Sequence, residues 1–202
     1  SKIKLLGLEK VAGWFADGLF NLLSKIVKLH DAKVEAITEI TNEVEIVFTD
    51  YSKSFENYLI RDKAWLDWRY LKSVRGKHHL LGVRETGKLT AILVLKEDEM
   101  LGNPALLLMD FAYLRGKETS LLYLIDQVRK KKVLADVKSN LLFISAITPI
   151  LPALKKIGFY QIPEKVNPRI LNLLARASGD FNESSILKKE NWLLTLGDWD
   201  VF

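Results

Sequence analysis

The sequence contains no cysteine, and this absence removes several kinds of chemistry at once. A chain without cysteine forms no disulfide, carries no thiolate nucleophile and builds no cysteine-based zinc site. The three histidines, His30, His78 and His79, do not have the spacing of metal ligands. We therefore predict no bound metal. The lack of cysteine also fits a reducing compartment, and we expect a cytoplasmic location.

Several familiar motifs are absent as well. The chain has no nucleophile elbow, no P-loop and no dinucleotide-binding fingerprint. It has no apolar run long enough to cross a membrane, because charged side chains interrupt the first 30 residues at Glu9, Lys10, Asp17, Lys25 and Lys28. The formal net charge of +5 is compatible with an anionic small molecule but is too small to predict nucleic-acid binding.

What is present is enough apolar material for one sizeable domain. The chain has 202 residues, of which 49% are hydrophobic, so it can bury a core. Residues 1–30 place apolar side chains at three- to four-residue spacing, which predicts an amphipathic helix. This helix either packs on a domain, which we favour, or lies at a membrane interface through Trp14 and Phe15. We assign residues 1–32 to a helical prefix that joins an upstream domain, and 33–202 to the main domain.

Alternating and helical patterns then follow one another along the main domain. Residues 33–48 alternate at period two, with Thr41-Asn42 as a turn or bulge, and this predicts strand. We expect a helix after Asp50, with Tyr51, Phe55, Tyr58 and Leu59 on one face, and a second helix over 62–70. The other predicted elements are strands at 79–84 and 89–95 joined by a turn at 85–88, a strand from 105, a helix over 117–132, a strand over 141–147, a helix from Pro149 to Gly158, and strands beginning at 159, 170 and 192. This order predicts an α/β fold with a mixed sheet and helices on both faces.

Three segments carry a resemblance to a known superfamily. Residues 62–70 read D-x-x-x-L-x-W-R-Y, residues 155–159 end a helix in x-x-x-G-F, and residues 192–200 read W-x-L-T-x-G-D-x-D. Their order, with the predicted elements around them, resembles the GNAT (acyl-CoA N-acyltransferase) superfamily from about residue 33 to the end. In particular, it resembles the C-terminal lobe of bacterial tandem GNAT-like proteins. The resemblance implies a largely antiparallel mixed sheet.

The resemblance also implies a donor site between Leu106 and Leu124. A strand there leads through a basic turn directly into a helix, whose N-terminus favours anions. In the superfamily, the turn has the form [QR]-x-x-G-x-[GA] and wraps the pyrophosphate of coenzyme A. The implied ligand is acetyl-CoA or another acyl-CoA. The implied site residues are Ala112, Tyr113 and Leu114 for the thioester arm and Arg115, Gly116, Lys117, Thr119 and Ser120 for the pyrophosphate.

Two positions depart from the superfamily pattern. Glu118 stands where the motif has its first glycine, and it adds a negative charge where a phosphate would approach. The same residue is also an ordinary first-turn helix residue that favours the helix dipole. Leu154 stands where many GNAT enzymes carry a tyrosine as general acid, and leucine cannot donate a proton. We therefore expect a degenerate site.

Other polar residues are candidates for the chemistry. Asp110 lies inside an apolar strand, so it is a candidate general base if it faces a cleft and a paired structural residue otherwise. Arg69 and Tyr70 belong to an aromatic, singly basic helix that either packs in the core or faces the substrate. His78 and His79 are adjacent at a strand start and point to opposite faces.

Three functions remain open from the sequence. The first is an acyltransferase that moves an acyl group from acyl-CoA to an amine or hydroxyl, in the setting of envelope or polysaccharide modification that the resemblance implies. The second is a catalytically inert lobe that shapes the site of a neighbouring domain. A third, weaker hypothesis is aminoacyl transfer to a peptide or lipid. In the first case the partners are a small-molecule acyl donor and an upstream domain of the same polypeptide.

Overall fold

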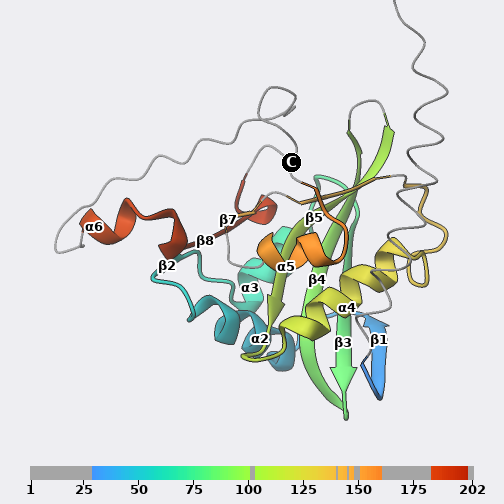
Figure 1. Ribbon diagram of the computed structural model, residues 1–202, viewed down its shortest axis with the longest axis horizontal. Helices are drawn as coiled ribbons and strands as arrows, with labels where there is room; N and C mark the ends of the chain where they lie inside the picture. Colours follow the sequence, from blue (N-terminus) through green and yellow to red (C-terminus); the bar gives the residue numbers. More distant parts are fainter. Residues whose placement is uncertain are drawn as a thin grey trace, which may run out of the picture.

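Two sheets form the framework of the protein. The computed structural model describes residues 29–100, 103–139, 141–144, 146–147, 151–160 and 183–199. A five-stranded sheet has the order β1-β3-β4-β5-β6, and a three-stranded sheet has the order β2-β8-β7 (Figure 1). The strands are β1 Ala32–Ala36, β2 Asn57–Tyr58, β3 His78–Glu85, β4 Lys88–Met100, β5 Asn103–Tyr113, β6 Leu141–Ile144, β7 Ala146–Ile147 and β8 Trp192–Thr195. The helices are α2 Asn42–Ser52, α3 Lys63–Leu66, α4 Glu118–Arg129, α5 Leu151–Lys156 and α6 Glu183–Ile186, with a π-helix η2 at Asp67–Leu71 and 3₁₀ turns η4 at Lys189–Asn191 and η5 at Leu196–Asp198.

The larger sheet is mixed and mostly antiparallel. β1, β3, β4 and β5 pair antiparallel in sequence, and β6 adds in parallel to β5. The β3–β4 hairpin closes through Thr86 and Gly87, both with positive φ (48° and 84°), as a type I′ turn requires. The predictions of this hairpin, of the strand from 105 and of the following helix are confirmed. The fold class predicted from the sequence is confirmed as well.

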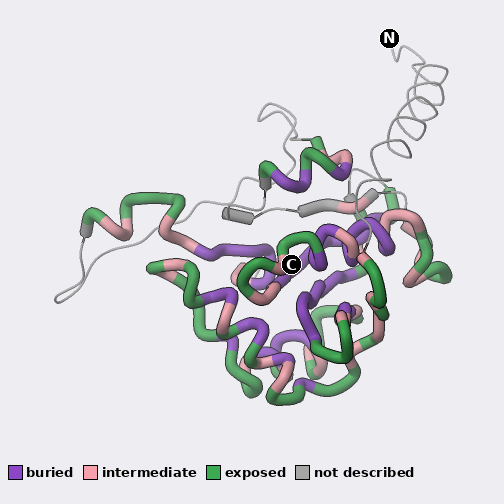
Figure 2. The backbone as a smooth tube through the Cα atoms, turned by 60° about the horizontal axis from the view of Figure 1, so that its bottom comes forward, coloured by how far each residue is buried: buried purple, intermediate pink, exposed green. Residues whose placement is uncertain are grey.

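Helices cover both faces of this sheet. Two adjacent residues of β3 contact helices on opposite faces. The Arg84 guanidinium contacts Glu43 of α2 at 2.8 Å, whereas the Glu85 carboxylate contacts Lys117, at the start of α4, at 2.8 Å. Successive side chains of a strand point to opposite faces, so α2 and α4 lie on opposite sides. Figure 1 shows α4 lying across the strands, and Figure 2 shows the buried segments gathered in the middle of the molecule.

The expected strand over residues 44–48 is wrong, because these residues form the first half of α2. The Thr41 side chain caps the helix by accepting from the Val44 N–H at 3.4 Å, and two glutamates in the first turn favour the helix dipole. The buried positions of this helix, Val44, Val47, Phe48, Tyr51 and Ser52, follow a helical spacing. The prediction of a strand depended on the alternation of Val44, Ile46 and Phe48. Because Ile46 is 59% exposed, these three residues do not share a buried face.

The helix expected after Asp50 is also wrong in its extent. Helix α2 ends at Ser52, and residues Asn57–Tyr58 form β2, which pairs in parallel with β8. The second predicted helix, over 62–70, is confirmed as α3 continued by η2. Its start is fixed by Asp62, which accepts from the Trp65 N–H at 2.7 Å.

Two predictions in the C-terminal third need correction. The continuous strand over 141–147 is two strands, because β6 pairs with β5 while β7 pairs with β8 in the other sheet. Phe159 does not begin a strand. Its N–H bonds the Leu154 carbonyl at 3.1 Å beyond Gly158, which has a φ of 91°, so this residue belongs to the end of α5. The strand expected from residue 192 is confirmed as β8.

Three other predictions lie outside the described residues. They are nearly all of the N-terminal helix over 1–30, the helix start at Pro149 and the strand over 170–175. Within the described part of the chain, every helix is too short or too polar to cross a bilayer.

The helical assignment of residues 44–48 predicts which side chains matter for stability. Val47 is 1% exposed, so Val47→Ala should lower the free energy of unfolding by about 2 kcal/mol through lost burial and a small cavity. Ile46→Ala, one residue away and exposed, should change it by no more than about 0.5 kcal/mol. Urea unfolding of both variants measures this. If Ile46→Ala lowered the free energy of unfolding more than Val47→Ala does, the strand expected from the sequence would be favoured instead.

Candidate functional site

Strand β5 changes its pairing abruptly at Met109. Opposite β4, Leu108 pairs with Leu95 and Asp110 pairs with Val94, so Met109 is an extra residue that forms a bulge. Parallel pairing with β6 reaches Leu108 and goes no further in the described residues. Among the described residues, no strand pairs with the second half of β5, residues 109–113, on the β6 side, and we call this half open in that sense. Bulges of this kind occur often beside active sites.

A short turn joins this open half of β5 to α4. Gly116 has a φ of 78°, and a Cβ atom added there would meet nothing within 4 Å. Helix α4 begins at Glu118, so the N-terminus of a helix lies here, although the N–H groups of Lys117 and Ser120 already donate to the Leu114 and Lys117 carbonyls at 2.8 and 3.0 Å. The backbone N–H of Arg115 donates to the Asp50 carboxylate at 3.0 Å. The turn thus has the form of an anion site, with one of its N–H groups already engaged by a carboxylate of α2.

The side chains of the turn have an internal partner. Lys117 Nζ lies 2.8 Å from Glu85 Oε2, and the Ser120 hydroxyl donates to Glu85 Oε1. Burial would raise the pKa of Glu85, but hydrogen bonds from Lys117, Ser120 and Thr90 outweigh it and hold this pKa below its usual value. Two of the side chains that the resemblance implied for pyrophosphate binding, Lys117 and Ser120, are thus directed at a carboxylate of β3.

Glu118 lies close to the open half of β5. Burial raises the pKa of the Tyr113 phenol, and the negative charge of Glu118 raises it further, while a hydrogen bond with Tyr51 lowers it. A carboxylate that acts on Tyr113 in this way also acts on any anion beside the turn. The electrostatic interpretation of Glu118 stays a prediction.

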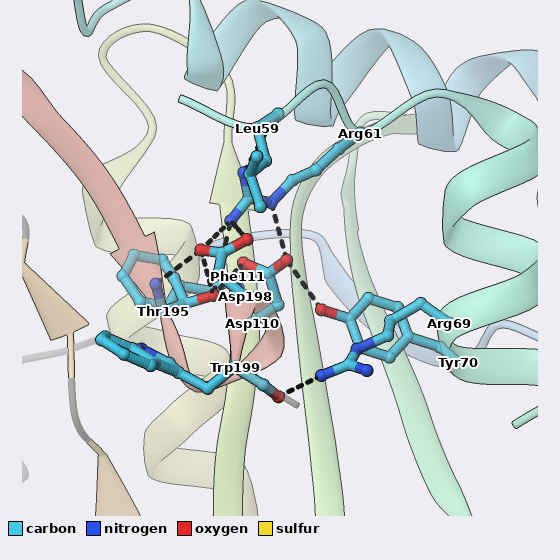
Figure 3. Close-up of polar contacts among 9 residues, drawn as sticks. All are labelled: Leu59, Arg61, Arg69, Tyr70, Asp110, Phe111, Thr195, Asp198 and Trp199. Atoms are coloured by element: carbon cyan, nitrogen blue, oxygen red, sulfur yellow. Dashed lines mark hydrogen bonds and ion pairs between the residues drawn. The ribbon is translucent and has the colours of Figure 1, made fainter. Parts of the chain in front are cut away.

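Asp110 lies in a buried polar cluster next to the bulge (Figure 3). Its Oδ2 atom accepts from Arg61 Nε at 2.8 Å and from the Tyr70 hydroxyl at 2.9 Å. Its Oδ1 atom accepts from the Phe111 N–H at 2.9 Å and from the Thr195 hydroxyl at 3.2 Å. Of the two alternatives posed for Asp110, the geometry is that of a paired residue. Its role as a base stays a prediction.

A second carboxylate shares the same guanidinium. Both oxygens of Asp198 accept from Arg61 Nη2, at 2.9 and 2.7 Å, and Oδ2 also accepts from the Thr195 N–H at 2.8 Å. Burial raises the pKa of Asp198 to about 6, with Asp110 adding to the rise and Arg61 opposing it. For Arg61, burial lowers the pKa, but the two carboxylates outweigh it and the net shift is upward. One cation thus holds two carboxylates, and burial makes Asp198 easier to protonate than an ordinary aspartate.

Arg69 and Tyr70 extend from the same helical element in different directions. Arg69 Nη2 donates to the backbone carbonyl of Trp199 in the C-terminal segment, while Tyr70 reaches Asp110 (Figure 3). Burial raises the pKa of Tyr70 well above its usual value, and Asp110 adds to this. Both residues are buried, so in this structure they connect η2 to β5 and to the segment after β8. Substrate contact by either of them stays a prediction.

Sequence reasoning missed several residues of these clusters, and the charged ones that matter most are Arg61, Asp198 and Glu85. Asp198 lies inside the quoted W-x-L-T-x-G-D-x-D segment, and Arg61 directly precedes the D-x-x-x-L-x-W-R-Y segment, so both had a signal. Glu85 had none, since it reads as an ordinary polar residue beside a hairpin turn. Its role depends on the packing of α4 against β3.

Comparison with solved structures decides the fold. No protein-family model and no curated protein matches the chain. A crystal structure described as that of a probable acetyltransferase matches with a TM-score of 0.50 and 13% identity, over 73% of this chain and 99% of that chain. The chain has the GNAT fold. This confirms the fold that the sequence resemblance implied.

Two other structures with the GNAT fold match less well. One is a ribosomal-protein-alanine N-acetyltransferase from Brucella melitensis biovar Abortus 2308, with a TM-score of 0.40 and 17% identity, over 56% of this chain and 78% of that chain. The other is an aminoglycoside acetyltransferase from an uncultured soil metagenomic sample, with a TM-score of 0.45 and 19% identity, over 74% of this chain and all of that chain.

The late helix of the GNAT fold contributes packing in this chain. Leu154 on α5 is 1% exposed and belongs to the hydrophobic core. The position at which the resemblance implied a general acid thus holds a buried aliphatic side chain. Among the described residues, no group of three or more histidine, aspartate or glutamate side chains could hold a metal ion.

The raised pKa of Asp198 predicts a pH-dependent contribution to stability. In the unfolded chain this carboxyl has a pKa of about 3.9, so between pH 6 and 4 only the folded state binds its proton. The contribution of Asp198 to stability is therefore greatest at low pH and is lost as pH rises through about 6. Relative to Asp198→Asn, the wild-type free energy of unfolding should rise by about 2 kcal/mol from pH 7 to 4.5. Urea unfolding of both proteins at each pH measures it. A difference that stays constant contradicts the assignment.

Gly197 predicts a steric coupling within the same cluster. A Cβ atom at this position would lie 2.0 Å from the Tyr70 hydroxyl oxygen and 3.2 Å from the Met109 carbonyl oxygen. Gly197→Ala should therefore destabilise the fold by about 1–3 kcal/mol through overpacking. Adding Tyr70→Phe removes the clashing oxygen, so the double variant should lose at least about 1 kcal/mol less than the sum of the single variants. Strict additivity in thermal unfolding would show that the two residues do not collide.

Proposed function

We propose that this protein is a GNAT-type acyltransferase, which transfers an acyl group from acyl-CoA to an amine or hydroxyl acceptor. The observation that carries this proposal is the change in β5 at Met109. Met109, the bulge residue, directly follows Leu108, which is the last residue of β5 paired with β6 among the described residues, and the second half of the strand leads directly into a helix N-terminus. An extended thioester arm fits beside an open strand half, and a pyrophosphate fits at a helix N-terminus.

The backbone of the turn and of the preceding strand suits such a donor better than the side chains of the turn do. The backbone of Ala112, Tyr113 and Leu114 would take the thioester arm. The turn has an open face at Gly116, where the chain lets a phosphate approach closely. Against this stand the Glu118 carboxylate and the engagement of Lys117 by Glu85. We therefore expect weak donor binding.

The bound donor would supply an activated thioester carbonyl. The work left to the protein is to place this carbonyl beside the bulge, exclude water and accept a proton from the attacking group. Asp110 is the residue we predict for proton transfer, and it shares Arg61 with Asp198. Burial raises the pKa of Asp198, the other carboxylate bound to Arg61, to about 6, and a pKa close to neutral suits a group that takes part in proton transfer.

A second candidate function is a GNAT-fold module without catalysis, which would support a neighbouring domain. It is favoured by the polar cluster, in which both oxygens of Asp110 and of Asp198 have partners within the protein. The buried leucine at position 154 favours it as well. The identity of the acceptor, the upstream domain, a role in envelope modification and the cytoplasmic location stay predictions.

Calorimetric titration with acetyl-CoA and with free coenzyme A tests the donor site. We expect weak binding to the wild-type chain and tighter binding, by about five- to tenfold, to Glu118→Gly and Glu118→Gln, because both remove a negative charge beside the phosphates. The glutamine variant controls for the change in helix propensity. Equal affinity of all three proteins would contradict the electrostatic role of Glu118. No binding by any of them at millimolar ligand would favour the non-catalytic module.

A further inference from the structure

The carboxylate of Glu85 meets the start of α4 in the way that an anionic ligand would. One oxygen accepts from the Ser120 hydroxyl, and the other lies 2.8 Å from the ammonium of Lys117. Glu85 comes from the end of β3, 35 positions from Ser120, so local chain geometry does not force this contact. A negatively charged group at this helix N-terminus is also favoured by the helix dipole.

The contact changes the charge of the turn. Lys117 is 43% exposed at its side chain, so it stands at the surface of the turn where an incoming phosphate would meet it. The Glu85 side chain is 15% exposed and cancels the Lys117 charge at close range. Asp50 and Glu118 add two more carboxylates around the same turn, with Arg115 as the other basic residue. The turn is therefore not the strongly cationic site that its sequence suggests.

We infer that Glu85 sets the affinity of the turn for phosphate-bearing donors. Its carboxylate competes with the donor's pyrophosphate for Lys117, the exposed member of the contact, and must give up Lys117 when the donor binds, whereas the buried Ser120 hydroxyl stays with Glu85. This inference rests on the function proposed above and names the residue that tunes the donor site. It follows that the protein discriminates little between a donor with a pyrophosphate and one that lacks it.

A purely structural role for Glu85 makes a different prediction. If the carboxylate only fastens α4 to β3, its removal loosens the turn and weakens binding of every donor alike. If it competes with phosphate, its neutralisation improves binding of donors that carry phosphate and of no others. Glutamine keeps the size of the side chain and one oxygen to accept from Ser120, so Glu85→Gln removes the charge with little loss of the local contacts.

The test measures two ligands on four variants by calorimetry. The ligands are acetyl-CoA and S-acetylpantetheine, which shares the thioester arm but lacks the pyrophosphate. The variants are Glu85→Gln, Lys117→Met, the double variant that combines both, and Glu97→Gln as a matched control. Glu97 is a carboxylate on β4 that pairs with His79 at 2.7 Å, away from the turn. Thermal unfolding of each variant verifies that it is folded.

We expect Glu85→Gln to bind acetyl-CoA about tenfold more tightly than the wild type, and S-acetylpantetheine equally well. The gain should shrink as salt rises and should be absent in the double variant, because it depends on the freed Lys117. Unchanged or weaker acetyl-CoA binding by Glu85→Gln, with the wild type still binding, overturns the inference and leaves the proposed function standing. If none of the proteins, Glu118→Gly included, binds either ligand, the proposed function falls and this inference falls with it.

Discussion

The buried guanidinium of Arg61 is the interaction on which the rest of the structure depends. It joins three parts of the chain that are far apart in sequence: the segment after β2, the middle of β5 through Asp110, and the turn after β8 through Asp198. Because Arg61 follows β2 and Asp198 follows β8, whereas Asp110 lies in β5, the ion cluster links the three-stranded sheet to the five-stranded one. A buried charge left without its partner is strongly destabilising, so the three segments are held together or not at all.

The larger sheet could be predicted from the sequence, because its signals are local. The β3–β4 hairpin shows in its turn residues, and the apolar run of β5 followed by a helical pattern marks the strand–turn–helix unit. Helix α2 was missed because three of its apolar residues also fit a strand alternation, and only the capping side chain of Thr41 separates the two. The helix is also favoured by burial of one of its faces, and this burial is visible in the structure but not in the sequence.

The candidate site was predictable in its position and not in its charges. The turn 114–120 is local and was found, since a helix N-terminus after a strand is visible in sequence. Its electrostatics come from residues brought by packing: Glu85 from β3 and Asp50 from α2. Similarly, Arg61 and Asp198 are separated by 137 positions, and no single-sequence pattern pairs them. The turn is basic in the sequence, but in the folded chain the carboxylates of Glu85 and Asp50 largely neutralise its positive charge.

The two neighbours at the end of β3 also protect the alignment of that strand. Arg84 faces the acidic groups Glu35 and Glu43 on one side, and Glu85 faces the basic Lys117 on the other. Sliding the strand by one position would exchange the two faces. A slide in one direction would put Arg84 in the place of Glu85, toward Lys117, and a slide in the other direction would put Glu85 in the place of Arg84, toward the two glutamates. The order of two adjacent residues therefore makes misalignment costly in either direction, quite apart from any ligand the molecule binds.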